Sequence, residues 1–116
     1  MDNQLKALEQ KILAFRDRRQ WAQFHSPKNL SQALGIEAAE LQEIFLWQTS
    51  EDSRKPSVDD RRRVESELAD IYIYLTYLCR ELDVDILQAV ENKLIENESK
   101  YPVDKSRGNN RKYNQL

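Results

Sequence analysis

Two pairs of acidic residues place the tightest limit on how this chain can fold, and within each pair the two acids have two other residues between them. Glu37 and Glu40 form the first pair, and Glu67 and Asp70 form the second. On an α-helix, residues three apart project from the same face, so each pair would present two acids about one turn apart. Both pairs lie on or beside apolar helical stripes, where a carboxylate carries a high desolvation cost unless a cation meets it. We therefore expect two helices that face each other across a shared group of four acids.

Four converging carboxylates repel one another unless a divalent cation lies between them. Di-iron carboxylate bundles use Glu-x-x-His pairs, and zinc sites usually recruit histidine or cysteine. The single histidine, His25, and the single cysteine, Cys79, lie outside the acidic pairs. An all-oxygen ligand set favours Mg²⁺, with Mn²⁺ as the second choice, and Mg²⁺ held by carboxylates typically binds substrate phosphates. The pattern predicts a Mg²⁺ site with a phosphorylated substrate; the alternative is that these acids lie on solvated helix faces.

The composition favours long helices, because only two glycines and three prolines occur among 116 residues. Apolar residues recur at helical spacing in four stretches: residues 4–19, 27–48, 58–82 and 84–99. Ser26-Pro27, Ser57 and Asp83 are expected to cap the last three helices, and residues 49–57 to form a polar loop. The predicted fold class is all-α, most simply a four-helix, bundle-like arrangement or a dimer of helical hairpins.

Two features of the predicted helices bear on packing. Gly35 lies inside the second helix, where glycine costs about 1 kcal/mol relative to alanine, and we expect close approach by another helix or a ligand to explain it. The third helix is apolar nearly all round between Ile71 and Leu78, which predicts burial on several sides, including at a subunit interface. The apolar residues of the fourth helix are expected to point inward: Ile86, Leu87, Val90, Leu94 and Ile95.

Length and charge limit the class of protein. The length fits one domain, expected over residues 1–104, with a basic, flexible tail at residues 105–116. A net charge of −2 gives no general reason to bind nucleic acid or membrane, and no apolar run could cross a bilayer. One cysteine cannot form an internal disulfide, so a reducing, cytoplasmic location is expected. A small chain with a charged interior has little core to spare, which favours oligomerisation.

Aromatic side chains near the acidic helices admit two interpretations. Rings in the connection after the first helix, at the end of the second and on the third could stack on a nucleobase, or they could pack the helices together. A lysine and an asparagine on the fourth helix could neutralise phosphate charge, although surface lysines usually remain solvated. The candidate substrate-binding residues are Trp21, Phe24, His25, Trp47, Tyr74, Lys93 and Asn97.

These motifs resemble those of the MazG-like, all-α nucleoside triphosphate pyrophosphohydrolases. Glu37-x-x-Glu40, followed after 26 residues by Glu67-x-x-Asp70, is similar to the acidic signature of that family. Other segments resemble its dCTP pyrophosphatase branch: the run from Asp17 to Leu30 with its W-x-x-F-H core, Phe45-x-Trp47, Glu67 to Leu75, Lys100-Tyr101-Pro102 and Arg111-Lys112-Tyr113. Many relatives begin the acidic motif with adjacent glutamates, whereas Ile36 precedes Glu37 here, which favours the same branch.

The resemblance implies Mg²⁺-dependent hydrolysis of a (deoxy)nucleoside triphosphate, with dCTP or a related nucleotide as the expected substrate, to the monophosphate and pyrophosphate. It implies that the four acids bind the metal and carry the catalysis, and that Trp21 to His25, Trp47 and Tyr74 form the base and sugar pocket. It also implies a homodimer or homotetramer. Because no histidine lies beside the acids, Glu40 is the preferred general base, and His25 is expected to contact substrate.

Two other classes of function compete with this hypothesis. In the first, the chain is a non-catalytic helical interaction module whose aromatic third helix binds a partner and whose acids are solvated. In the second, the cations of residues 105–116 bind nucleic acid, against which the near-neutral net charge argues.

Overall fold

A computed structural model describes residues 2–116, with the side chain of Asp2 left out. These residues form α-helices and short 3₁₀ helices without a strand, so the predicted all-α class is confirmed. The chain divides after Asp83 into two compact units, which are described separately below. Within the described part of the chain, no helix combines the length and apolarity needed to span a membrane.

The first unit begins with helix α1, Asp2–Arg18, whose last turn carries Arg16 and Arg18 where the helix dipole favours cations. Gln20 then adopts a left-handed conformation with φ of 55°, which turns the chain into the 3₁₀ helix η1, Trp21–Phe24. The aromatic connection predicted after the first helix is thus a single, defined turn of 3₁₀ helix.

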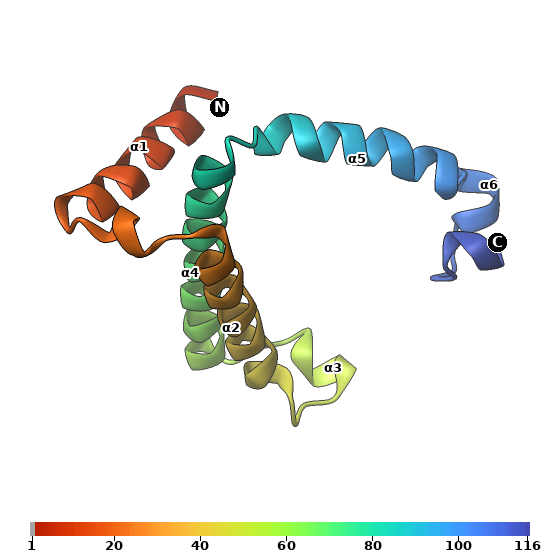
Figure 1. Ribbon diagram of the computed structural model, residues 1–116. Coiled ribbons are helices and arrows are strands. Elements are labelled where there is room, and N and C mark those ends of the chain that lie inside the picture. The colour runs from red at the N-terminus through yellow and green to blue at the C-terminus, as the bar shows by residue number, and fades with distance from the viewer. Residues whose placement is uncertain (1) are drawn as a thin grey trace. The chain divides into compact units, whose positions relative to one another are not determined.

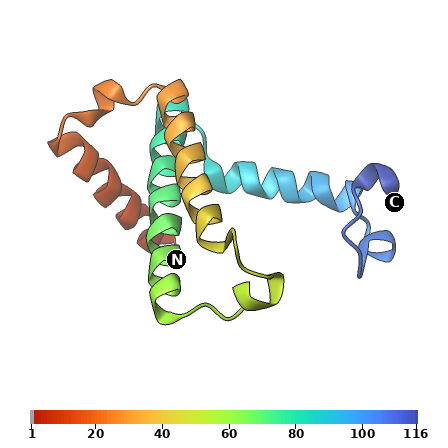
Figure 2. The same ribbon diagram turned by 90° about the horizontal axis from the view of Figure 1, so that it is seen from below.

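Helices α2, Pro27–Phe45, and α4, Val58–Leu82, lie side by side in both ribbon views and form the main packing of the first unit (Figure 1, Figure 2). Both predicted caps are confirmed. The hydroxyl of Ser26 accepts a hydrogen bond from the Asn29 amide at 3.1 Å, and that of Ser57 accepts one from the Asp60 amide at 3.1 Å. These caps fix where the two acid-bearing helices start.

A small apolar core joins α1 to the helix pair. Ile12 and Leu13 of α1 pack with Leu30 of α2 and Tyr77 of α4, and Leu30 is only 1% exposed. The hydroxyl of Tyr77 also donates to the Ile12 carbonyl at 3.4 Å. Near this core, the Arg16 guanidinium, 9% exposed, pairs with Asp17 at 2.9 Å and reaches Glu81 of α4 at 3.6 Å. The packing therefore holds α1 against the C-terminal half of α4.

The segment between α2 and α4 differs from the prediction in two ways. Helix α2 ends at Phe45, not at Gln48, so Trp47 lies in the turn after the helix. The predicted loop of residues 49–57 contains a short helix, α3, Ser50–Ser53, capped by the Thr49 hydroxyl at 3.1 Å from the Asp52 amide. Serine, threonine and aspartate form such local caps readily, which the polar composition alone did not separate from an open loop.

Gly35 does not meet the expected close approach within the chain. A Cβ atom added there would find no atom within 4 Å among the described residues. Packing against another helix therefore does not explain this glycine within the described residues.

The second unit contains α5, Ile86–Lys100, then α6, Val103–Ser106, and the 3₁₀ helix η2, Tyr113–Gln115. The expected cap at Asp83 is wrong: Asp85 caps α5, and Asp83 ends α4 in a left-handed conformation with φ of 53°. Either aspartate matches the sequence pattern of a cap, and the backbone conformation decides between them. The apolar residues of α5 expected to point inward are exposed instead: Ile86, Leu87, Val90, Leu94 and Ile95.

Candidate functional site

Three of the four predicted acids come together between α2 and α4. Glu37 of α2 and Glu67 and Asp70 of α4 each offer a carboxylate oxygen, and these oxygens all lie within 4.8 Å of one another. All three side chains are half-buried. The i, i+3 spacing places Glu67 and Asp70 on the face of α4 that packs against α2, as the sequence predicted.

Two oxygens in this cluster have no hydrogen-bond partner although they are buried: Oε2 of Glu37 and Oε2 of Glu67. A buried carboxylate oxygen without a donor costs free energy, so native proteins rarely leave one unpaired. Carboxylate oxygens are the ligands that hard dications such as Mg²⁺ and Mn²⁺ prefer. The donor set and the two unpaired oxygens therefore fit a divalent cation.

The electrostatics of Glu37 point the same way. Its pKa is raised from 4.5 to about 7, first by burial, then because the protonated acid can hydrogen-bond to Glu67 and Glu40, and finally by repulsion from Glu40 and Asp70. Without a cation, the cluster therefore holds a proton near neutral pH. A dication would replace that proton as the compensating charge.

Glu40, the fourth predicted acid, lies one turn after Glu37 on α2 and is exposed. It is near enough to Glu37 to raise the pKa of that residue, but it is not one of the three acids within 4.8 Å of one another. The structure thus brings Glu37, Glu67 and Asp70 together and leaves Glu40 at the edge of the cluster, facing solvent.

Two of the predicted binding residues, Tyr74 and His25, place their rings against the ring of Tyr77. Tyr74 lies one turn after Asp70 on α4, and its ring meets that of Tyr77 edge-on at 6.2 Å. The ring of His25 stacks against the same Tyr77 at 4.8 Å, and burial, followed by the charge of Arg16, lowers the pKa of His25. His25 is therefore neutral near pH 7, and its buried Nδ1 atom has no hydrogen-bond partner.

The other predicted aromatics are more accessible. Trp21 meets Phe15 edge-on at 5.8 Å, with the Arg19 guanidinium 3.6 Å from the Phe15 ring centre, and Phe24 is exposed. Trp47 is 92% exposed. An indole that contacts so little of its own chain is available for another molecule.

A cavity of about 220 Å³ opens between α1 and α4, lined by Lys11, Ile12, Phe15, Ile73 and Tyr77. These residues were not among the site residues that the sequence predicted. On α4 the signal was present, because Ile73 and Tyr77 lie three and seven residues after Asp70 and so share its helix face. On α1 no comparable signal exists, since its apolar residues read as core alone.

The remaining two candidates, Lys93 and Asn97, lie on α5 in the second unit. The ammonium group of Lys93 pairs with Glu96 at 3.1 Å, and Lys100 pairs with the same glutamate at 3.0 Å. Both pairs are on the surface, where such contacts contribute little to stability and are easily exchanged.

The chain is similar to several known proteins. The sequence model of the MazG-like family matches residues 33–116, which include all four acids. The chain is 42% identical over 104 residues to dCTP pyrophosphatase 1 of Bos taurus, and 38% identical over 104 residues to dCTP pyrophosphatase 1 of Homo sapiens. These alignments cover 88% of this chain but only 62% and 61% of the two relatives, so the chain spans about three fifths of their length.

A solved structure is also similar to this chain, both in fold and in sequence. The crystal structure of a pyrophosphatase from Archaeoglobus fulgidus aligns with a TM-score of 0.79 and 41% sequence identity, over 85% of this chain and 93% of that one. Identity at this level, together with the acidic pairs at the α2–α4 packing and the family match over most of the chain, leads to one assignment. The chain belongs to the MazG-like family.

Proposed function

We propose that this protein is a Mg²⁺-dependent nucleoside triphosphate pyrophosphohydrolase that cleaves dCTP or a related nucleotide to the monophosphate and pyrophosphate. The observation that carries the proposal is the cluster of Glu37, Glu67 and Asp70, with two buried and unpaired carboxylate oxygens. The similarity to dCTP pyrophosphatase 1 and to an archaeal pyrophosphatase supports the same class of reaction.

Glu37, Glu67 and Asp70 would hold the cation, with Glu40 completing the set from the edge of the cluster. Bound Mg²⁺, or Mn²⁺ in its place, would neutralise phosphate charge and lower the pKa of a water molecule. Zinc is a poor match, because His25 stacks on Tyr77 and Cys79 is a half-buried thiol whose pKa is raised by burial.

Glu40 is our choice for the general base. It is the exposed member of the four acids and can therefore face the attacking water, whereas Glu37 and Glu67 each bury an oxygen. A carboxylate at the rim would accept the proton of that water and release it to solvent. No histidine lies beside the described acids to take this role, and neutral His25 is proposed to contact the nucleotide.

The base and sugar are proposed to bind among the aromatic residues on the Tyr74 side of the cluster. The 220 Å³ cavity beside Ile73 and Tyr77 is apolar apart from Lys11, which suits the flat face of a single ring. Trp21 and Phe24 of η1, together with Trp47, offer further exposed rings for stacking. Lys93 and Asn97 remain proposed phosphate contacts.

The assembly and the place of action are also proposals. Within the described residues, large apolar side chains remain exposed on both units, including Ile36 and Leu68 in the first and Leu94 and Ile95 in the second. Exposed apolar surface of this kind favours a homodimer or homotetramer built from a bundle-like arrangement of helices. We retain a domain over residues 1–104, a basic tail at residues 105–116 and a cytoplasmic location as predictions from the sequence.

The function is tested by measuring phosphate release from all common NTPs and dNTPs, with Mg²⁺ and an added inorganic pyrophosphatase. Preference for deoxycytidine nucleotides supports the proposal in full, and hydrolysis of unrelated nucleotides alone restricts it to the reaction class. Absence of hydrolysis, with no rise in melting temperature on adding Mg²⁺ and a nucleotide analogue, would instead favour the non-catalytic interaction module.

A further inference from the structure

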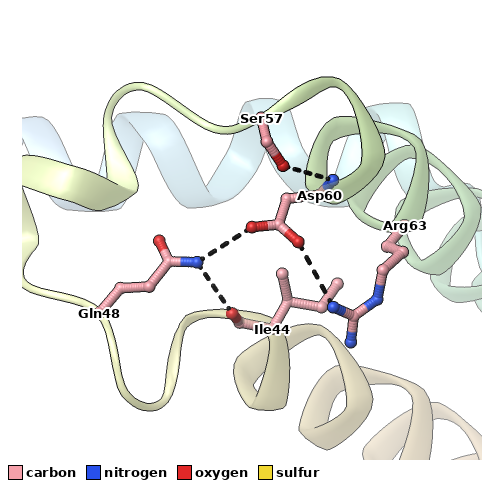
Figure 3. A network of polar contacts seen from close by, with 5 residues as sticks. All are labelled: Ile44, Gln48, Ser57, Asp60 and Arg63. Atoms are coloured by element: carbon pink, nitrogen blue, oxygen red, sulfur yellow. Dashed lines mark hydrogen bonds and ion pairs between the residues drawn. The ribbon is translucent and has the colours of Figure 1, made fainter.

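A small polar network joins the end of α2 to the start of α4 (Figure 3). The side-chain amide of Gln48 donates to the Ile44 carbonyl at 3.2 Å and to a carboxylate oxygen of Asp60 at 3.2 Å. The other oxygen of Asp60 accepts from the Arg63 guanidinium at 3.4 Å. Gln48 and Arg63 approach Asp60 from opposite sides. Gln48 therefore holds the carboxylate in place, and the carboxylate orients the guanidinium of Arg63.

Arg63 lies on the acid-bearing face of α4. It precedes Glu67 by four residues and Asp70 by seven, so the three side chains follow one stripe of the helix. The helical rise places Arg63 about 10 Å from Asp70 along the axis, on the side away from Tyr74 and Tyr77. Along α4, therefore, an arginine, the acids and the aromatic residues occur in that order.

The guanidinium of Arg63 is free to bind a second anion. It is 61% exposed, and its 3.4 Å contact with Asp60 is a surface ion pair, which contributes little to stability and is readily exchanged. Only one of its five N–H donors is used in the described contacts. The planar fork of an arginine matches two oxygens of a phosphate group, and this one contacts Asp60 through a single terminal nitrogen, Nη1.

The proposed substrate needs such a cation. A triphosphate brings several negative charges to a site that already holds four acids, more than one dication can offset. The described part of α2 carries a single cation, Lys28, in its first turn and far from Glu37. Arg61 and Arg62 are two positions and one position before Arg63, respectively, so they project from other sides of α4, and Arg61 pairs with Glu65.

We propose that Arg63 binds the terminal phosphates, so that the nucleotide lies along α4 with its base toward Tyr77 and its leaving pyrophosphate toward Arg63. Gln48 and Asp60 are positioning residues for that guanidinium. This inference rests on the proposed function, to which it adds a phosphate-binding residue and a direction for the substrate.

The test measures binding of inorganic pyrophosphate and of dCMP, each with Mg²⁺, by titration calorimetry. Arg63→Ala is compared with Arg62→Ala, which removes the same charge from the neighbouring position. Arg63→Ala should raise the dissociation constant for pyrophosphate about tenfold or more, since a hydrogen bond to a charged group contributes about 1.5–3 kcal/mol, and should leave dCMP binding unchanged. Arg63→Lys should restore part of the affinity, and Arg62→Ala should resemble the wild type.

Three results would overturn the inference: equal effects of Arg63→Ala and Arg62→Ala, an equal loss of pyrophosphate and dCMP affinity in Arg63→Ala, or no pyrophosphate binding by the wild type. Because these titrations need no turnover, they are independent of the test of the function. A wild-type protein that hydrolyses no triphosphate but binds pyrophosphate through Arg63 would reject the enzyme and keep the anion site. Far-UV circular dichroism of each variant checks that α4 is intact.

Discussion

Glu37 on α2 and Glu67 on α4 meet across the packing of the two helices, and each keeps one buried carboxylate oxygen without a hydrogen-bond partner. In the absence of a cation this arrangement costs free energy, since the acids repel one another and one of them must hold a proton. The same arrangement becomes favourable when a dication binds. The site therefore couples metal binding to the stability of the helix pair.

Replacing Glu37 with Gln should stabilise the metal-free protein and weaken metal binding at the same time. The amide removes one of the converging charges and can donate to Glu67, so the melting temperature in EDTA should rise by a few degrees at pH 8. The further rise caused by Mg²⁺ in the wild type should be lost. Differential scanning fluorimetry with and without Mg²⁺ measures both effects, and a lower melting temperature in EDTA would show that the cluster is not repulsive.

The slope of stability against pH should reverse its sign when Mg²⁺ is present. The pKa of Glu37 is raised from 4.5 to about 7 in the folded state, so the metal-free folded protein binds this proton more tightly than the unfolded chain. Its contribution is therefore present below about pH 4.5 and is lost as the pH rises through about 7. With Mg²⁺, ionised Glu37 is favoured, and the stabilisation by metal should grow over that interval. Melting curves at several pH values, in EDTA and in Mg²⁺, test this; a Mg²⁺ effect that is independent of pH would contradict it.

Replacing Glu40 with Gln should abolish turnover and leave the fold unchanged. Glu40 is exposed and outside the group of three acids, so the amide leaves the helix packing unchanged, although it removes part of the repulsion that raises the pKa of Glu37. A loss of at least about 100-fold in kcat is expected for removal of a general base. Steady-state kinetics, with calorimetric titration of Mg²⁺ as the control, measures it. Full activity in this variant would exclude Glu40 as the base.

Tyr77 should affect stability mainly through its ring. It packs in the core with Ile12 and Leu30, while its hydroxyl makes one long hydrogen bond of 3.4 Å. Tyr77→Phe should therefore cost less than about 1 kcal/mol, and Tyr77→Ala about 3–5 kcal/mol. Urea unfolding at fixed protein concentration measures both. Equal costs for the two variants would show that the hydroxyl, not the ring, holds α1 against α4.

Gly35→Ala should stabilise α2 by about 0.5–1 kcal/mol, because the added methyl group meets no atom within 4 Å of its position in the chain. Thermal unfolding of the purified variant measures the change. A decrease in stability would mean that a second copy of the chain or a ligand needs the space beside Gly35.

Much of the first unit could be predicted from sequence, since its signals are local. Ser26 and Ser57 were found as caps because a capping hydroxyl acts within three residues, and the acids were found because i, i+3 spacing fixes a helix face. The meeting of Glu37 with Glu67 and Asp70 followed from the cost of burying acids singly. Each of these inferences needs only short-range geometry and one energetic rule.

Other features depend on information that local patterns lack. The choice between Asp83 and Asp85 as the cap of α5 depends on which residue adopts the left-handed conformation. The cavity beside Ile73 uses Phe15 and Lys11 from α1, a helix whose packing angle the sequence does not encode locally. The network around Asp60 was missed because Gln48 and Asp60 are twelve residues apart and meet only when the chain turns back through α3.

The exposure of Trp47 gives the protein an optical reporter of its own. An indole that is 92% exposed is surrounded mostly by water. Any molecule that covers it should therefore shift its emission maximum to shorter wavelength or quench its fluorescence. The only other tryptophan is Trp21, so a Trp21→Phe chain carries a single tryptophan, located just after the acid-bearing helix α2. Titrating that chain with nucleotide, and separately diluting it, would distinguish occupancy by a small molecule from occupancy by another copy without any attached dye.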